Sequence, residues 1–392
     1  MSGSAAAQDR APVPEVDGAA APTTAAPASA QPAAAGAAAQ EPKPPEGFQV
    51  GGFTFRPGGR IKLDIIRDFT RMGNEDSFDT RTIPLGDVEG GNSNLHAKES
   101  RLSLDIRGKV DDHELRMYFE TDFYGANTVM RLRQAFGTYR GWLAGQAWST
   151  FVDDDNLPRT IDFESPTAFA SIRQAQLRYT WKTGAAAWSA AVEDNKSTVE
   201  VVGGTSGTTE FPSPDFVGRV RFDIGSGHIQ TAGFVGAARF RLFDETPETA
   251  TLWGWALSAN FGTIGRDTAY GVFTFGDGIG RYRGGTAAVL DADGELHAVR
   301  AIAFMGGYEH FWASRWSTNA VYSVGKADDQ PFLPDDFNRR LTYGAVNLLY
   351  WFLGDRGWMG VEYLYGRREV FGGVPNEGTA HRVQYAVRFN LP

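Results

Sequence analysis

The feature that most constrains this chain is a two-residue alternation of apolar and polar side chains, which recurs from Gly47 to the C-terminus. One segment places Leu115, Met117, Phe119, Thr121 and Phe123 on one face, against Glu114, Arg116, Tyr118, Glu120 and Asp122 on the other. A period of two predicts a β-strand, and charges at nearly every position of one face are too costly for a packed core. The pattern therefore favours a transmembrane β-barrel, whose inner face meets water and whose outer face meets lipid.

Sixteen segments carry this alternation, and each has about the length that a tilted strand needs to cross a bilayer. They lie at 59–68, 99–109, 113–123, 130–139, 142–149, 171–182, 186–194, 214–224, 228–240, 250–261, 267–276, 297–308, 311–324, 340–352, 358–367 and 380–391. The connections alternate between short and long, except that 124–129 is short where a long one is expected. Short periplasmic turns and longer external loops are typical of outer-membrane barrels. We therefore predict an all-β, antiparallel barrel of about sixteen strands over residues 47–392.

The composition excludes several other classes of protein. No apolar run reaches the length of a transmembrane helix, and the absence of cysteine excludes disulfides and thiolate metal sites. The net charge of -9 argues against nonspecific nucleic-acid binding. The six histidines show no metal-ligand spacing, so we predict no metal and no cofactor. A large soluble β-sandwich or propeller is the structural alternative, although no blade-length repeat is visible.

Residues 1–46 differ from the rest of the chain. From Ala11 to Glu46 the sequence is rich in alanine, proline, threonine and glutamine, with few large apolar side chains to bury. Such a composition predicts a disordered linker, because it cannot offset the entropy lost on ordering. Ala5-Ala6-Ala7 resembles the end of a signal peptide. The natural start of translation then lies upstream, although an engineered start would look the same.

Aromatic and small residues on the predicted outer face indicate how the barrel meets its surroundings. Eight tryptophans lie mostly near predicted strand ends, where interfacial girdles belong: Trp142, Trp148, Trp181, Trp253, Trp312, Trp316, Trp351 and Trp358. Ala135, Gly137 and Ala144 are small positions at which neighbouring barrels can approach closely. We therefore expect outer-membrane lipid and lipopolysaccharide around the barrel, and close contact with further copies of the chain.

The connection at 150–170 is too polar to cross lipid, and we expect it to fold into the lumen as a constriction loop. It contains the acidic run Asp153, Asp154 and Asp155, which suits a cation site, an acidic wall of the constriction or a solvated corner. A hydrolase that uses Asp153 and Glu164 as acid and base is the enzymatic alternative. Nothing in the spacing of those two carboxylates fixes them across a substrate.

Basic residues on the predicted inner face are the main candidates for selecting solutes. Alternation points Arg131, Arg133, Arg178, Lys182, Arg219, Arg221, Arg239 and Arg241 into the lumen, and Arg159 lies on the constriction loop. A guanidinium group presents a fixed fork of donors that matches carboxylates and phosphates. A ladder of such groups opposite a narrowing loop concentrates anions and excludes cations. The alternative is that they pair with inward acids such as Glu120 and Asp122 and only fix the shape of the barrel.

Two stretches carry a family resemblance. They are Tyr118–Gly125 followed by Arg131–Gly137, and Leu143–Phe151 with Asp153, Pro158, Thr160, Asp162, Phe163 and Pro166 behind it. Together they resemble the DcaP-like family of trimeric outer-membrane porins, with a good match from about Gly51 to Trp181.

The resemblance implies a sixteen-stranded barrel in the outer membrane of a Gram-negative bacterium, assembled as a homotrimer. It also implies passive uptake of small anionic solutes such as dicarboxylates. The alternative function is an outer-membrane barrel that acts as an enzyme or adhesion scaffold without channel activity. Conductance in planar bilayers separates the two.

Overall fold

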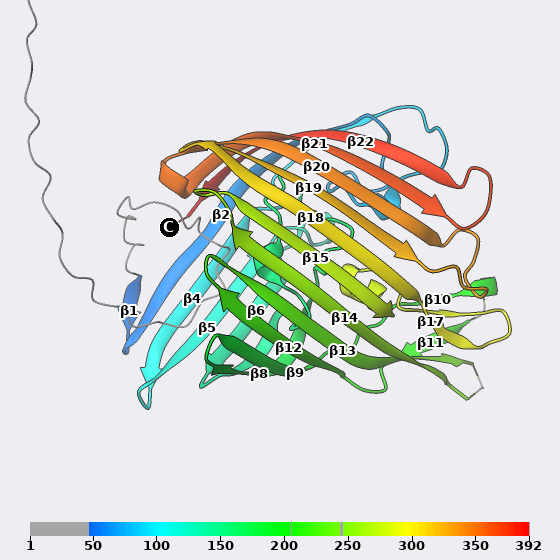
Figure 1. Cartoon of the computed structure of the whole chain (residues 1–392), viewed down its shortest axis with the longest axis horizontal. Coiled ribbons are helices and arrows are strands. Elements are labelled where there is room, and N and C mark those ends of the chain that lie inside the picture. The colour runs from blue at the N-terminus through cyan, green and yellow to red at the C-terminus, as the bar shows by residue number, and fades with distance from the viewer. Residues whose placement is uncertain (1–46, 205, 244–245, 392) are drawn as a thin grey trace, which may run out of the picture. The chain divides into compact units, whose positions relative to one another are not determined.

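Sixteen long strands pair in sequence and close on themselves (Figure 1). They are β2 (Phe53–Asp68), β4 (Arg101–Val110), β5 (His113–Asp122), β6 (Arg131–Tyr139), β7 (Trp142–Trp148), β8 (Arg173–Thr183), β9 (Ala186–Glu193), β12 (Asp215–Ile224), β13 (Gly227–Leu242), β14 (Glu248–Gly262), β15 (Thr268–Asp277), β18 (Arg300–Ala313), β19 (Trp316–Ala327), β20 (Asn338–Phe352), β21 (Gly357–Val370) and β22 (Glu377–Asn390). Every one of these pairings is antiparallel, so the predicted barrel is confirmed.

This computed structural model describes residues 47–204, 206–243 and 246–391. The expectations for residues 1–46 lie outside the described residues. No helix of the described part is both long and apolar enough to span a membrane.

Strand β2 closes the barrel by pairing with both ends of the sheet. Its residues 60–68 pair with β22, and its residues 54–60 pair with β4. The short strands β3 (Asn92–His96) and β1 (Phe48–Val50) add to β2. Closure satisfies the backbone hydrogen bonds that an open sheet edge would expose to lipid.

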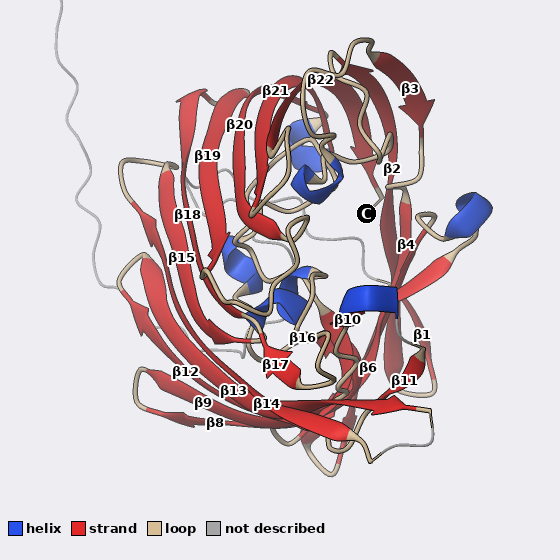
Figure 2. Ribbon diagram, turned by 90° about the vertical axis from the view of Figure 1, so that its right-hand side faces the viewer, coloured by secondary structure: helices blue, strands red, loops and turns tan. Residues whose placement is uncertain are grey.

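Further short elements belong to the connections. Strand β11 (Gly207–Glu210) pairs with β13, while β10 (Val199–Val201), β16 (Ala288–Leu290) and β17 (Leu296–Ala298) form a separate sheet. The 3₁₀ helices are η1 (Thr80–Thr82), η2 (Ala126–Thr128), η3 (Asp154–Asn156), η4 (Val202–Gly204), η5 (Ile279–Arg283) and η6 (Gly354–Arg356). Several of these helices and loops lie inside the ring of strands (Figure 2). The lumen is therefore partly filled by the chain's own connections.

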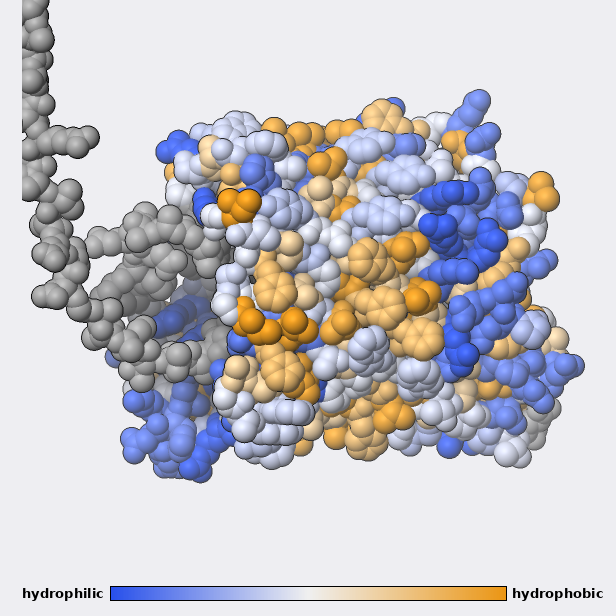
Figure 3. Space-filling view, in the orientation of Figure 1, coloured by the Kyte–Doolittle hydropathy of each residue, from blue (hydrophilic) through white to orange (hydrophobic). Residues whose placement is uncertain are grey.

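The two faces of the wall differ as the alternation predicts. On β8, Gln174 and Gln176 are buried, whereas Leu177, Tyr179 and Trp181 are exposed. On the face that Figure 3 shows, exposed apolar side chains of this kind form a belt across the wall. A belt of this kind is the surface that a barrel presents to lipid.

Three predicted members of the aromatic girdle are wrong, because Trp148, Trp351 and Trp358 pack against clusters inside the barrel. Trp358 on β21 is only 5% exposed and packs inside with Leu349 and Ile161. It sits between two cations, Lys62 and Arg388, each 5.9 Å from its ring centroid. An internal loop covers this tryptophan, so its position near a strand end does not place it in the membrane interface.

Candidate functional site

The connection between β7 and β8, residues 149–172, runs into the barrel and is named the constriction loop. Its first part reaches β13 and β14, where Asp153 Oδ2 accepts hydrogen bonds from His228 Nε2 at 2.8 Å and Ser258 Oγ at 2.5 Å. Asn156 then donates to the carbonyl oxygen of Gly271 on β15 at 3.2 Å. These contacts fix the start of the loop to strands far along the chain.

The second part of the constriction loop is held by the last strands. The Glu362 carboxylate on β21 accepts the backbone N–H groups of Ile161 and Asp162, both at 2.8 Å. Arg382 on β22, which is fully buried, donates to Asp68 on β2 at 2.6 Å and to Asp162 at 3.1 Å. Buried charges need such pairing, because an unpartnered one is costly. The predicted inward course of the loop is confirmed.

Phe163 of the constriction loop meets the wall at β6. Its ring stacks on Tyr124 with a centroid separation of 3.8 Å. The guanidinium groups of Arg131 and Arg133 lie 5.5 and 5.8 Å from the Phe163 centroid. Cation–π contacts of this kind fix the position of the ring, so these two arginines help to hold the loop.

Arg131 and Arg133 are also ion-paired. Arg131 Nε donates to Asp122 at 2.7 Å, and Arg133 donates to Glu120 and Asp122, both at 2.7 Å. Arg133 lies at an irregularity of the β5–β6 ladder, which turns its side chain into the buried cluster. The structural-pairing alternative therefore describes both arginines, whose charges are compensated by neighbouring carboxylates.

Arg178 on β8 and Arg219 on β12 point inward on either side of β9 and are not ion-paired. Neither has a carboxylate within 4.0 Å among the residues that the structure describes, and Arg219 donates to Ser189 Oγ at 3.1 Å. The acid whose charge acts on both is Asp154 of the constriction loop. These two guanidinium groups are therefore available to a passing anion.

Asp154 is itself poised to change charge. Burial and the neighbouring carboxylates of Asp155 and Asp153 raise the pKa of Asp154 to about 6, against the opposing charges of Arg219 and Arg178. It is therefore mostly ionised at neutral pH and becomes neutral in mild acid.

The remaining basic candidates divide between the loop and the wall. Arg221 is ion-paired with Asp155 and, at 2.8 Å, with Asp223. Arg159 on the constriction loop lies 3.3 Å from Glu309, with its guanidinium 5.6 Å from the Trp351 centroid. Both residues therefore tie the loop to the inner wall.

The predicted inward orientation of Arg239 and Arg241 is wrong. Both share the outer face of β13 with Val235, and Arg241 pairs with Glu210 at 2.6 Å. The inner face carries Phe234 and Phe240, which join the internal hydrophobic cluster. The aromatic residues of this strand therefore face the internal cluster and not the lipid. The arginines, which alternate with them, face outward. Lys182 is exposed at the periplasmic end of β8.

Sequence reasoning missed several inner cations. Arg173 lies over the Trp148 ring at 3.8 Å and is acted on by the charges of Arg133 and Arg101. Arg388 on β22 lies close enough to Arg101 to be acted on by its charge. Alternation marks Arg101 and Arg388 as inward, but nothing in the sequence shows that strands so far apart bring them together with Arg173.

A second internal connection, residues 278–299, was predicted only as an external loop. Its η5 residue Arg281 is ion-paired with Asp215 on β12, and Tyr282 Oη donates to the same carboxylate at 2.9 Å. The Tyr282 carbonyl oxygen accepts the backbone N–H of Ser171 at 2.9 Å. The end of the constriction loop therefore rests on this second connection.

A cavity of about 610 Å³ lies where the constriction loop meets the long connections. Arg81, Glu164 and Arg283 line it, and Arg283 donates to the Thr167 carbonyl oxygen at 2.6 Å. Burial and the charge of Asp79 raise the pKa of Glu164 to about 7, against the charge of Arg81. Burial and Arg81 lower the pKa of Arg283 to about 10. The cavity therefore carries both signs of charge on the external side of the loop.

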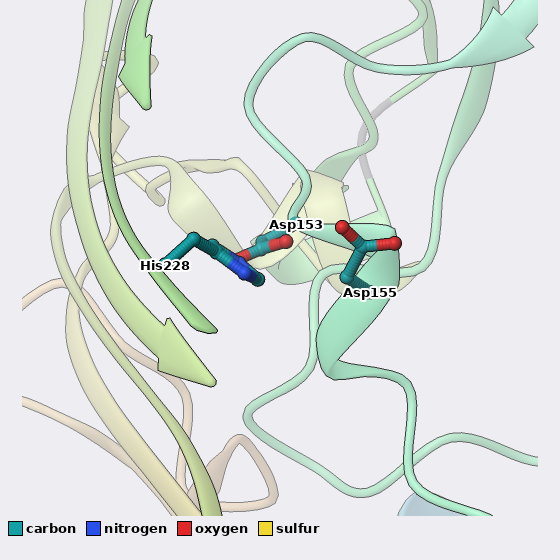
Figure 4. Close-up of side chains that lie close together, drawn as sticks. All are labelled: Asp153, Asp155 and His228. Carbon is teal, nitrogen blue, oxygen red and sulfur yellow. The ribbon is translucent and has the colours of Figure 1, made fainter. Parts of the chain in front are cut away.

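The acidic run does contain a geometric candidate for a cation site. Asp153, Asp155 and His228 offer ligand atoms within 4.8 Å of one another (Figure 4). However, Asp153 Oδ2 accepts from His228, Ser258 and Asn156, and Asp155 is ion-paired with Arg221. These contacts account for the group as an attachment of the loop, and Asp153 is buried where a solvated corner would be exposed.

A second group, Asp291, Glu295 and His297, lies in the connection 278–299. The Asp291 carboxylate accepts the backbone N–H groups of Glu295 and Asp293 and a contact from His297 at 2.8 Å. The backbone hydrogen bond from Glu295 is the main cause that lowers the pKa of Asp291. This arrangement is that of a side chain closing a turn.

Comparison with known proteins agrees with this architecture. The family model described as DcaP outer membrane protein matches residues 52–391. The crystal structure of the outer membrane channel DcaP of Acinetobacter baumannii superposes with a TM-score of 0.78 at 22% identity, covering 88% of this chain and 100% of that one.

Two more distant structures share the fold. An anion-selective porin from Comamonas acidovorans has a TM-score of 0.59 at 10% identity, covering 86% of this chain and 100% of its own. The trimer form of OmpT of Vibrio cholerae has a TM-score of 0.55 at 12% identity, covering 87% and 100%. No curated protein matches the sequence.

Proposed function

Because the chain belongs to the DcaP outer membrane protein family, we propose that this integral outer-membrane porin admits small anions, dicarboxylates among them, and works as a homotrimer. The observation that carries the anion preference is the pair Arg178 and Arg219, inward guanidinium groups with no carboxylate within 4.0 Å among the described residues. A positive charge that is not held in an ion pair, in a narrow passage, raises the local concentration of anions. The ion-paired Arg131 and Arg133 contribute more to the rigidity of the wall than to the electric field in the lumen.

A dicarboxylate suits this arrangement for a physical reason. Conduction needs sites that attract the solute and yet release it. Arg173, which has no ion pair among the described residues, adds further positive charge on the inner wall at the start of β8. A solute with two carboxylates can engage one guanidinium group before it leaves another. The overall charge of -9 does not oppose this, because distant charges are screened within about 10 Å in salt.

The decisive measurement is the reversal potential of the purified protein in a planar bilayer under a potassium chloride gradient. We expect well-defined channel conductance and a reversal potential on the anion-selective side. Cation selectivity would sink the proposed anion preference while leaving the porin itself in place. Complete absence of conductance would instead favour the enzyme or scaffold alternative.

The geometry gives the enzyme alternative little support. Asp153 is bound to His228 and Ser258, while Glu164 lines the cavity beside Arg81. The two carboxylates that a hydrolase would need are thus held by different neighbours.

The trimer rests on the family and on small outward residues. Ala135 and Gly137 on β6 and Ala144 on β7 leave the wall without bulky side chains, so that neighbouring barrels can approach closely. We expect a heat-modifiable trimer in mild detergent. A single species of 42.7 kDa by mass measurement would contradict it.

A further inference from the structure

A groove of about 460 Å³ opens on the outer wall across β15, β18, β19 and β20. Its apolar part is formed by Phe273, Ile302, Phe304 and Val324. Ile302 and Phe304 are exposed, so they belong to the lipid-facing belt. Lys326 and Arg340 border the same groove, and both are exposed. One groove therefore offers an apolar surface and two cations.

The two cations face each other without a counterion. Lys326 on β19 and Arg340 on β20 are direct partners in the strand register, as are Ile302 and Lys326. Like charges directly opposite in a sheet repel each other. No carboxylate lies within 4.0 Å of either residue in the described part of the chain. Glu369 on β21 also borders the groove and is the register partner of Arg340 on its other side, but its carboxylate is ion-paired with Arg339 at 2.7 Å and with Arg367 at 3.4 Å.

Other arginines at this end of the wall are ion-paired, unlike Lys326 and Arg340. Arg300 on β18 pairs with Asp277 at 2.8 Å, and Arg367 pairs with Glu377. Both of these lie on the same end of the wall as Lys326 and Arg340. Among the described residues around the groove, Lys326, Arg339, Arg340 and Arg367 thus share the single carboxylate of Glu369, with Glu377 pairing Arg367 as well, and the remaining positive charge can be met by an external anion.

The position of the cations fixes the kind of anion. Lys326 and Arg340 lie at the strand ends that lead into the long connections, which are external in this class of barrel. In Figure 3 hydrophilic residues gather at this end of the apolar belt, over the ends of β18, β19 and β20. That level is the headgroup region of the outer leaflet, and the apolar part of the groove lies deeper, at the level of the acyl chains.

We propose that the groove binds a phosphorylated, acylated lipid of the outer leaflet, the class to which lipopolysaccharide belongs. A lipid phosphate bridges Lys326 and Arg340, for which the guanidinium fork is well suited. An acyl chain lies along Ile302, Phe304 and Val324. A soluble anion has no reason to prefer this place, because the groove floor faces hydrocarbon.

The groove remains open in the proposed trimer. In the closed strand order, β6 and β19 are separated by β5, β4, β2, β22, β21 and β20 on one side, so they lie on opposite sides of the sheet. The small outward residues proposed for the contact between barrels lie on β6 and β7. Lipid can therefore reach the groove in the assembled trimer.

The test uses the purified full-length protein in mild detergent, with bound lipid counted by native mass spectrometry. The probes are diphosphorylated lipid A and the same lipid without phosphates. We expect Lys326→Gln with Arg340→Gln to bind diphosphorylated lipid A about thirtyfold more weakly, as the loss of two surface cations implies. The matched control is Arg315→Gln, an exposed cation at the other end of β19, which should bind as the native protein does.

Three outcomes would overturn the proposal. One is native-like binding by the double variant, and another is equal binding of the phosphate-free lipid. The third is displacement of bound lipid A by an equal concentration of inorganic phosphate, because the apolar part of the groove would then contribute nothing. An unchanged reversal potential of the double variant shows that the channel itself is intact.

Discussion

Two groups of inward arginines lie on this barrel, and they differ in what surrounds them. Arg131 and Arg133 on β6 are ion-paired with Glu120 and Asp122, and they clamp Phe163 of the constriction loop. Arg178 and Arg219 face Asp154 at longer range with no ion pair. A compensated arginine contributes a local dipole, whereas an uncompensated one contributes a net charge. The number of arginines in a lumen therefore says less about selectivity than their partners do.

The largest effect is expected where charge is uncompensated. We expect Arg178→Gln with Arg219→Gln to lower the anion-to-cation permeability ratio about thirtyfold, since each of the two charges is worth about 1 kcal/mol at a few ångströms in water. Reversal potentials in a salt gradient measure this. The matched control is Arg133→Gln with Glu120→Gln, which removes as many charged groups but leaves the net charge unchanged. Equal shifts in the two double variants would remove the distinction between the groups.

The paired group should respond in stability instead. Arg133→Ala removes the cation that the buried Asp122 and the largely buried Glu120 share, so that Asp122 keeps only Arg131 and Glu120 keeps only Arg101 at 3.7 Å. Breaking a buried pair costs about 3 kcal/mol. We expect a clearly lower midpoint in denaturant unfolding. Adding Glu120→Gln to this variant should restore part of the loss, because fewer carboxylates are then left uncompensated. A stability equal to that of the native protein would mean that the cluster is solvated.

Mild acid should increase the anion preference that Arg178 and Arg219 produce. The pKa of Asp154 is raised to about 6, so lowering the pH from 7.5 to 5 converts it from mostly ionised to mostly neutral. The negative charge facing Arg178 and Arg219 then disappears, and the anion preference rises, by about threefold on the scale of one partly screened charge. The Asp154→Asn variant should have, at every pH, the anion-to-cation permeability ratio that the native protein has in acid. A pH response that survives in Asp154→Asn would assign it to another group, such as Glu164.

The smallest effect is expected on the outer face. Arg239→Gln with Arg241→Gln removes two arginines that do not face the lumen, so the reversal potential should stay at the native value in ordinary salt. A shift in reversal potential as large as that of Arg178→Gln with Arg219→Gln would show that charges on the outer face also determine the selectivity of the channel.

The sequence by itself determined the barrel. Period-two alternation and connection lengths follow from the bilayer, which acts on every strand in the same way, so local residues report them. The sixteen predicted segments correspond to strands of the structure, and the inward course of the constriction loop followed from its polarity. The family resemblance rested on short stretches around β5, β6 and β7, and the family match extends it to residues 52–391.

Only the tertiary structure decided which charges are compensated and which faces are covered. Arg382 meets Asp68 and Asp162 across 314 and 220 residues of sequence, and no local pattern encodes such an encounter. Phe234 and Phe240 face inward because internal connections cover them, which reversed the assignment of Arg239 and Arg241. Alternation tells which residues share a face, but what lies against that face depends on segments that arrive from elsewhere in the chain.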